Sequence, residues 1–386
     1  MEQQRIPRRR VVKVSWFELF YDLVIVAAVA HGGHLLVHDL LIADDLSFSL
    51  GVWLTSTFVV TFLLWFSTSM AINIAPGDIP LRKTLMFVQM LAVAVANLAL
   101  SRSDGLPDDW GFASLAIAFA TVSIIFAIVG REVPALARAA APWRTCTGAT
   151  AVMFALGVLL PDAWITVQLV VFALGILTAG VPIAIFGIPR LCRDGRLEPE
   201  HLAERVGQLV IIVIGESFIG LILAIGGLES IPGPAFFLLT FIVAGSLWSI
   251  YFTSVFPMGI PGTSVRLEVW LLGVMVFLVG TSYLAENLSA YASVDWASLS
   301  TPHTFIPLSA VYVLLGALLL GWIGGATRDR HFVGIHLCAL AVLGVAWIAL
   351  VIGGSQANLL LLASSIVVIA DGLACYAFRP RELATL

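Results

Sequence analysis

Ionisable side chains interrupt apolar sequence in two stretches of this chain. The stretch "SWFELFYDLVIVAAVAHGGHLLVH", residues 15–38, carries Glu18, Asp22 and His31. The stretch "HLAERVGQLVIIVIGES", residues 201–217, carries His201, Glu204, Arg205 and Glu216. An ionised side chain at the centre of a bilayer costs at least about 2.5–3.5 kcal/mol on insertion scales. We therefore expect these groups to face the interior of a helix bundle, where they could bind protons or ions.

Each of these stretches begins with ionisable residues at helical spacing. Glu18 and Asp22 are four residues apart, and His201 and Glu204 are three apart, so each pair shares one face of a helix. Both pairs lie where an apolar run begins, and Arg82 and Arg266 begin two further runs. We expect a cytoplasmic charge cluster that consists of Glu18, His201, Glu204, Arg205, Arg82 and Arg266. This cluster could act as a gate, or it could only fix the cytoplasmic ends of the helices.

Glu216 is the candidate for a site deep in the membrane. It follows Glu204 by twelve residues, which places it about 18 Å deeper in a helix and near the bilayer centre. Desolvation there favours the protonated acid, as a proton- or cation-coupled transporter requires. His31 lies at comparable depth and Asp22 one turn inside the membrane. We therefore expect Glu216, His31 and Asp22 to couple ion binding to substrate transport. Gly215 beside Glu216 would let a neighbouring helix approach or the backbone open, which suits such a transporter. Alternatively, Glu216 is only a protonated hydrogen-bonding partner.

Histidines supply the weak candidates for a metal site. His31, His34 and His38 form an H-x2-H-x3-H pattern, followed by acidic residues, and could ligate a metal or relay protons. The acidic residues are Asp39, Asp44 and Asp45. The pattern approaches the outer interface, where a solvated histidine is ordinary. His336 and Asp371 also lie inside apolar runs, but no motif supports a role for them.

The composition indicates a polytopic membrane protein. Apolar residues make up 60% of the 386 residues and charged residues 11%, and mean hydropathy is +1.02. The net charge is −4 and the basic residues occur in short clusters, so no surface for nucleic acid is expected. No cofactor motif is present, and the loops are too short for an ATPase domain. The isolated cysteines are expected to be reduced packing residues: Cys146, Cys192, Cys338 and Cys375. The tryptophans, Trp65 among them, are expected in interfacial belts and lipid-facing packing.

The predicted fold is all-α, with about 12 transmembrane helices, because a bilayer core of about 30 Å needs about 20 apolar residues in a helix. The expected spans are 17–38, 49–72, 84–100, 111–130, 146–160, 164–188, 206–227, 235–256, 268–285, 305–325, 332–352 and 357–378. If the N-terminus is cytoplasmic, all of the 20 Lys and Arg residues except Arg102 fall on the cytoplasmic side. Both termini are then expected in the cytoplasm, and the protein is expected in the cytoplasmic membrane.

Internal similarity predicts a repeat of two six-helix halves, with chance coincidence of Leu, Val and Ile in apolar sequence as the alternative. An offset of 186 residues aligns "ELFYDLVIV" with "ERVGQLVII", and "FST" at 66–68 with "FTS" at 252–254. An offset of 184 aligns Arg82 with Arg266. With an even number of spans in each half, the two repeats share one orientation. The predicted divisions are a basic N-terminus (1–16), a first half (17–188), a linker (189–205), a second half (206–378) and a tail (379–386).

The two charged stretches carry a family resemblance. "WFELFYDLVIV" and "HLAERVGQLVIIVIGES" resemble the signature blocks of the bacterial low temperature requirement protein A (LtrA) family, E-L-F-F-D-L-V-F-V and H/Y-x-x-E-R-x-G-L-F-x-I-I-x-L-G-E-S. Departures from the blocks are Tyr21 for Phe, and Gln208 with Leu209 for Leu-Phe. The positions carried over are Glu18, Asp22, His201, Glu204, Arg205, Gly215 and Glu216. The resemblance implies a multi-spanning membrane protein, with no agreed substrate or reaction.

Three functions fit these residues. The first is a secondary transporter of a small solute, coupled to protons or another cation, with Glu216 as the ion site and the charge cluster as the inner gate. The second is a membrane-embedded enzyme whose carboxylates and histidines, with or without a metal, act on a hydrophobic or lipid-linked substrate. The third is a non-catalytic membrane partner or sensor. The expected partners are the lipid bilayer and a small molecule or ion; the sequence indicates no oligomeric state.

Overall fold

Every regular element in the described part of the chain is helical. The computed structural model describes residues 14–28, 48–77, 79–100, 108–183, 197–226, 234–261, 264–293, 305–324, 330–352 and 357–378. These residues form twelve α-helices, of which the first covers residues 16–28. The others are α2 (Phe48–Ile74), α3 (Pro80–Leu100), α4 (Asp109–Glu132), α5 (Ala137–Val158), α6 (Ile165–Val181), α8 (Pro199–Gly226), α9 (Pro234–Ser249), α10 (Ser264–Ser293), α11 (Phe305–Leu318), α12 (Arg330–Ile352) and α13 (Ala357–Ala377).

Many of these helices could cross a membrane. Within the described residues, six segments are long and apolar enough by length and composition, and they lie in α3, α4, α9 with its continuation, α10, α12 and α13. Shorter apolar helices are Phe58–Ile74, Ile165–Val181 and Ser309–Gly321. Two of the remaining helices, the first helix and α8, are those that carry the ionisable stretches. The all-helical fold expected from the sequence is therefore confirmed, with six long apolar candidate spans and three shorter apolar helices in the described part of the chain.

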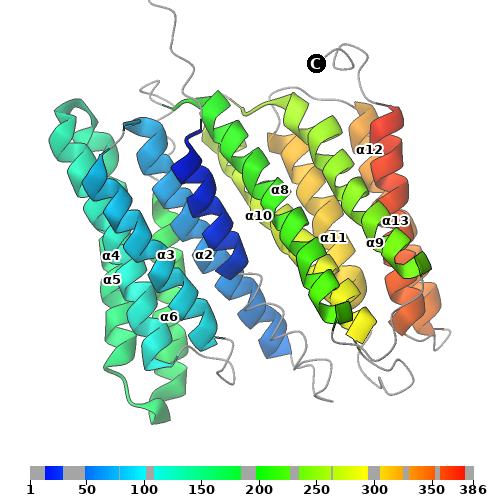
Figure 1. The fold of residues 1–386 in the computed structure, drawn as a ribbon, viewed down its shortest axis with the longest axis horizontal. Coiled ribbons are helices and arrows are strands. Elements are labelled where there is room, and N and C mark those ends of the chain that lie inside the picture. The colour runs from blue at the N-terminus through cyan, green and yellow to red at the C-terminus, as the bar shows by residue number, and fades with distance from the viewer. Residues whose placement is uncertain are drawn as a thin grey trace, which may run out of the picture.

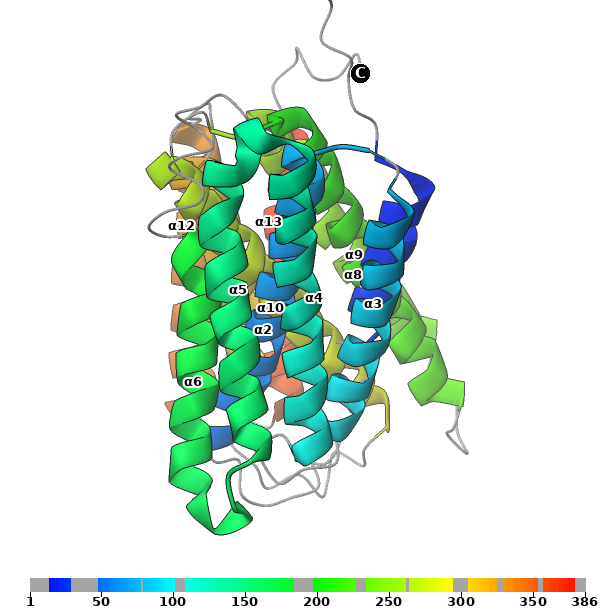
Figure 2. The same cartoon turned by 90° about the vertical axis from the view of Figure 1, so that its left-hand side faces the viewer.

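The two halves of the chain form two groups of helices. In Figure 1 the first helix and α2–α6 lie on one side, in blue to green, and α8–α13 lie on the other, in green to red. Figure 2 shows the first group from its outer side. The groups meet where the first helix lies beside α8, and where α2 contacts α8 and α10. The first helix begins, and α13 ends, at the same end of the bundle (Figure 1).

The helices bury a core of aromatic and aliphatic side chains and expose many other large apolar ones. Phe112, Phe154 and Phe172 join α4, α5 and α6 through ring contacts. Large apolar side chains such as Leu177 and Val345 are exposed by 66% and 70%. An outer surface this apolar suits contact with lipid rather than water.

Two π-helical turns lie in the described residues of the second half. The π-helix η4 (Ile250–Val255) continues α9, and η7 (Leu319–Gly324) continues α11. The two contact each other, and η4 also contacts α13. Turns of this kind interrupt regular helical hydrogen bonding and occur frequently at functional sites.

Several helices differ in their bounds from the expected spans, with the largest extensions in α5, α8 and α10. Helix α5 begins at Ala137 instead of 146 and contains Pro142, α8 begins at Pro199 instead of 206, and α10 continues to Ser293 instead of 285. The expected spans ended where charged or polar residues begin. A helix can continue past the apolar segment because its backbone hydrogen bonds do not depend on the hydropathy of its side chains.

Candidate functional site

Glu18 links the start of the first helix to α8. Ser15 Oγ accepts a hydrogen bond from the Glu18 backbone N–H (3.3 Å), and Glu18 Oε1 accepts from the Ser15 N–H (3.2 Å) and hydroxyl (2.8 Å). This reciprocal arrangement is a capping box. The other carboxylate oxygen, Oε2, lies 3.1 Å from His201 Nε2 and 3.5 Å from Arg205 Nη1. The cap therefore fixes the side chain that reaches across to α8.

Asp22 and Arg205 form the centre of this site. Both side chains are fully buried, and Arg205 Nη2 donates to Asp22 Oδ1. The indole Nε1–H of Trp65 on α2 donates to the same oxygen at 2.7 Å, and the guanidinium lies 5.6 Å from the Trp65 ring. Asp22 Oδ2 and Arg205 Nε are buried without a hydrogen-bond partner among the described residues. We call Glu18, Asp22, His201 and Arg205 the buried network.

The end of α2 positions His201. Asn73 Oδ1 accepts from the Glu198 backbone N–H, and Asn73 Nδ2 donates to the Glu198 carbonyl, both at 3.0 Å. The same Nδ2 lies 3.3 Å from His201 Nδ1. The imidazole is 3% exposed and lies between an amide on one nitrogen and a carboxylate on the other. Asn73 therefore ties the chain segment before α8 to α2 and orients the histidine.

A second polar layer lies beside the buried network. Tyr21 OH donates to Gln89 Oε1 at 2.8 Å, and Thr68 Oγ1 donates to the same oxygen at 3.1 Å. All three side chains are fully buried. They connect the first helix, α2 and α3, so the position of Asp22 on the first helix is set by hydrogen bonds on both sides.

The expected cytoplasmic charge cluster is only partly brought together. Glu18, His201 and Arg205 meet, whereas Glu204 is exposed on α8. Arg82 does not pair with Glu18 in this conformation, because its Nη1 donates to the Ala75 carbonyl at 2.6 Å and its Nη2 lies 3.8 Å from Glu132 Oε2. Arg266 is partly buried near the start of α10.

The expected deep residues are described only in part. Glu216 is half-buried on α8. A Cβ at Gly215 would meet none of the described atoms within 4 Å, and α8 is unbroken there, so the described residues add nothing to the expected close helix approach. The histidine candidates and the acidic residues after them lie outside the described residues, namely His31, His34, His38, Asp39, Asp44 and Asp45.

The structure adds residues that the sequence analysis missed. Trp65 is 1% exposed and hydrogen-bonded to Asp22, so its assignment to an interfacial or lipid-facing position is wrong. The S-x-x-E spacing of Ser15 and Glu18 is a signal that predicts the capping box, whereas no local pattern pairs Asn73 with His201. The contact between His336 and Asp371, on α12 and α13, also had no motif to reveal it.

Comparison with known proteins assigns the chain to a family. No curated protein matches the chain. The family model described as "Bacterial low temperature requirement A protein (LtrA)" matches residues 13–371, which include the whole buried network and both signature blocks. A match over this length confirms the resemblance, and the chain belongs to the bacterial low temperature requirement A protein family.

Proposed function

We propose that this multi-pass membrane protein is a secondary transporter of a small solute, coupled to protons or another cation. One observation carries the proposal: four ionisable side chains are buried together where the two groups of helices meet. Glu18 and Asp22 come from the first helix, and His201 and Arg205 come from α8. These two helices begin the two predicted halves of the chain, so the buried network joins the parts that a transporter must move.

The energetics of the buried network suit a gate that opens better than a permanent link between the first helix and α8. A buried ion pair gains little net stability, since desolvation offsets much of the attraction between the charges. An apolar pair would hold the two helices equally well. Charged partners have the further property that they can separate when water, an ion or a proton reaches them. We therefore assign the inner gate to Glu18, Asp22, His201 and Arg205.

The buried network also has a site for a proton or a cation. Asp22 Oδ2 is a buried acceptor without a partner among the described residues. Proton transfer to Asp22 would neutralise its carboxylate, weaken the attraction between the first helix and α8 and favour opening.

Glu216 is the proposed coupling site deeper in the membrane. It follows Arg205 by eleven residues, which at about 100° per residue is three turns plus about 20°. The two side chains therefore project from the same face of α8, about 16 Å apart along the helix axis. An ion that passes the buried network would meet Glu216 on the same path.

The proposed topology has twelve spans, with both termini in the cytoplasm and two six-helix repeats. The common end of the first helix and α13 supports it (Figure 1). The buried network, at that end, then faces the cytoplasm, in accord with the distribution of Lys and Arg in the sequence.

Flux through liposomes tests the proposal. Purified protein is reconstituted with a trapped pH indicator, and a panel of amino acids, sugars, nucleosides and inorganic cations is added under an imposed pH gradient. We expect at least one solute to drive proton movement, and Glu216→Gln to abolish it. Glu200→Gln is the matched control, because Glu200 is an exposed acid in the first turn of α8. Absence of flux for every solute, together with wild-type behaviour of Glu216→Gln in cells, would contradict the proposal.

A further inference from the structure

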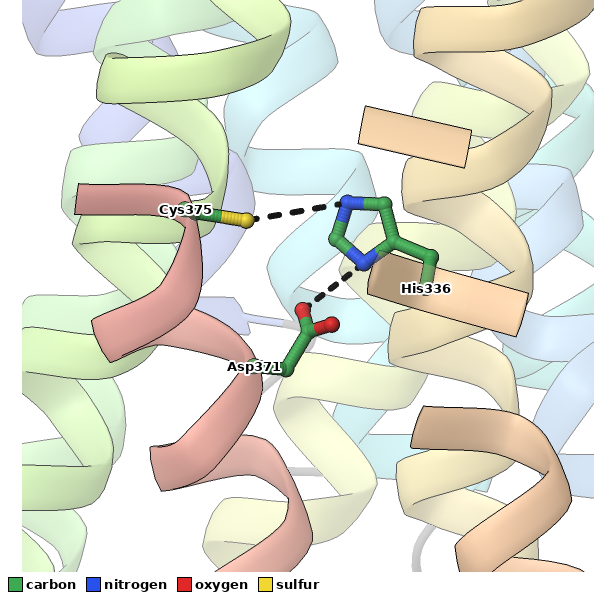
Figure 3. A group of neighbouring side chains, drawn as sticks. All are labelled: His336, Asp371 and Cys375. Atoms are coloured by element: carbon green, nitrogen blue, oxygen red, sulfur yellow. Dashed lines mark hydrogen bonds and ion pairs between the residues drawn. The ribbon is translucent and has the colours of Figure 1, made fainter. Parts of the chain in front are cut away.

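A second group of buried polar side chains lies in the other half of the protein. It consists of His336 on α12 with Asp371 and Cys375 on α13. Among the described residues, these are the three His, Cys, Asp or Glu side chains whose ligand atoms all lie within 4.8 Å of one another. All three side chains are buried, at 0%, 2% and 3% exposure. Figure 3 shows the imidazole between the carboxylate and the thiol. The proposed transport path does not use these residues.

The histidine is oriented by the carboxylate. His336 Nδ1 lies 2.7 Å from Asp371 Oδ2, so the ring nitrogen on this side is occupied. The other nitrogen, Nε2, then points at Cys375 Sγ, 3.8 Å away. Carboxylates hold metal-binding histidines in this way, because the contact fixes the ring and leaves the far nitrogen as the ligand.

The distance between the nitrogen and the sulfur fits a shared cation. With metal–nitrogen bonds of about 2.0–2.1 Å and metal–sulfur bonds of about 2.3 Å, a tetrahedral zinc site separates these two atoms by about 3.6 Å. The observed 3.8 Å matches this ligand-to-ligand edge within a few tenths of an ångström. Thiolate with imidazole is the donor set of Zn²⁺ and similar cations, whereas Mg²⁺ and Ca²⁺ prefer oxygen.

The surroundings hold the donors, and a groove reaches Asp371 beside them. Asp371 and Cys375 are four residues apart on one face of α13, and this part of α13 packs against α9, where Ser249 Oγ donates to the Gly372 carbonyl at 2.9 Å. Between α12 and α13 lies a groove of about 560 Å³, lined by His331, Cys338 and Asp371 among others. Asp371 therefore borders both the groove and the buried imidazole.

We infer that His336 and Cys375 form a binding site for a divalent cation of the Zn²⁺ class, with Asp371 as the positioning residue for the imidazole. Binding releases the thiol proton of Cys375 and joins Nε2 and Sγ through the metal. These two side chains leave further coordination positions for water or a third donor. A site with open positions suits an exchangeable cation, since closed sets of four protein ligands are typical of structural zinc.

Titration with Co²⁺ tests this inference in the full-length protein, in detergent, with a phosphine reductant and no chelator. Cobalt bound to a thiolate gives a charge-transfer band in the near ultraviolet, which Zn²⁺ should remove by competition. We expect the band in wild type and its loss in Cys375→Ala and His336→Asn. Asp371→Asn should weaken Co²⁺ binding by about 10–100-fold, the usual effect of removing such a positioning group.

Cys338→Ala is the matched control. Cys338 is an exposed cysteine two residues from His336 and lines the same groove, so it would bind metal adventitiously if any cysteine there did. The band should persist in this variant. A band that disappears in Cys338→Ala and persists in Cys375→Ala would overturn the inference, as would the absence of any thiolate band in wild type. Melting curves of each variant without metal establish that it is folded before the comparison is made.

Discussion

Arg205 on α8 and Asp22 on the first helix form an ion pair in which both side chains are fully buried. Loss of one partner leaves the other charge buried and uncompensated, which costs about 3–5 kcal/mol. We predict that Asp22→Asn or Arg205→Leu lowers the melting temperature of the detergent-purified protein strongly. Asp109→Asn, at an exposed aspartate in the first turn of α4, should change it little.

The double variant Asp22→Leu/Arg205→Leu distinguishes the loss of one charge of the pair from the loss of both. When both charges are replaced with apolar groups, no uncompensated buried charge remains. The double variant should therefore regain most of the stability that the single variants lose. Its transport should remain impaired, because the apolar pair no longer responds to protons or ions. If the double variant were as unstable as the sum of Asp22→Leu and Arg205→Leu measured singly, Arg205 and Asp22 would not be coupled.

Trp65→Phe should destabilise the protein through the loss of one hydrogen bond. The variant removes the indole N–H that donates to Asp22 at 2.7 Å, and a hydrogen bond to a charged group is worth about 1.5–3 kcal/mol. Trp143→Phe is the control, since Trp143 is also buried but its Nε1 has no hydrogen-bond partner among the described residues. Thermal melts should show a larger loss for Trp65→Phe. Equal losses would mean that only the change in volume matters.

Ser15→Ala should loosen the start of the first helix. It removes the hydroxyl of the capping box, which is worth about 0.5–2 kcal/mol. Because Glu18 also contacts His201 and Arg205, the loss should reach the buried network. Hydrogen–deuterium exchange should show faster exchange in residues 16–20, and Ser15→Thr should retain protection. Unchanged exchange in Ser15→Ala would show that the cap does not hold Glu18.

Gly280→Ala should disrupt the contact between α10 and α11. A Cβ at Gly280 would lie 2.5 Å from the backbone nitrogen of Val313, which cannot move aside as a flexible side chain could. Gly245→Ala on α9 meets none of the described atoms within 4 Å, and alanine is favoured over glycine inside a helix by about 0.5–1 kcal/mol. We expect a lower melting temperature for the first variant and an equal or higher one for the second. The reverse order would show that α10 and α11 are not packed this closely.

Hydropathy and helical spacing were sufficient to predict the architecture. A described α-helix lies at each of the twelve expected spans, because runs of about 20 apolar residues are a long and redundant signal. The four-residue spacing predicted that Glu18 and Asp22 share one face of a helix. The charged residues at the start of the apolar runs predicted that His201 and Arg205 lie at the same end of the bundle as Glu18. Helix ends were predicted less well, since α5 and α10 continue through residues that a hydropathy window rejects.

Contacts between helices were harder to predict than the helices themselves. Nothing near Trp65 in the sequence indicates that its indole meets Asp22, 43 residues earlier, and Arg82 meets Glu132 instead of Glu18. The contact between Cys375 and His336 likewise depends on how α13 lies against α12. Such partners are set by tertiary packing, and the local periodicity of one helix carries no information about the rotation of another.

Accessibility of position 216 tests the transport account most directly, because alternating access requires this site to be reached from both sides of the membrane. The measurement is labelling of Glu216→Cys, with the native cysteines replaced by alanine, by a charged membrane-impermeant thiol reagent in right-side-out and inverted vesicles. Ile219→Cys, one turn away at an exposed apolar position, is the control and should not be labelled from either side. We predict labelling at position 216 from both sides, with faster cytoplasmic labelling when Asp22→Asn opens the buried network. Labelling from one side alone, unchanged by Asp22→Asn, would contradict the account.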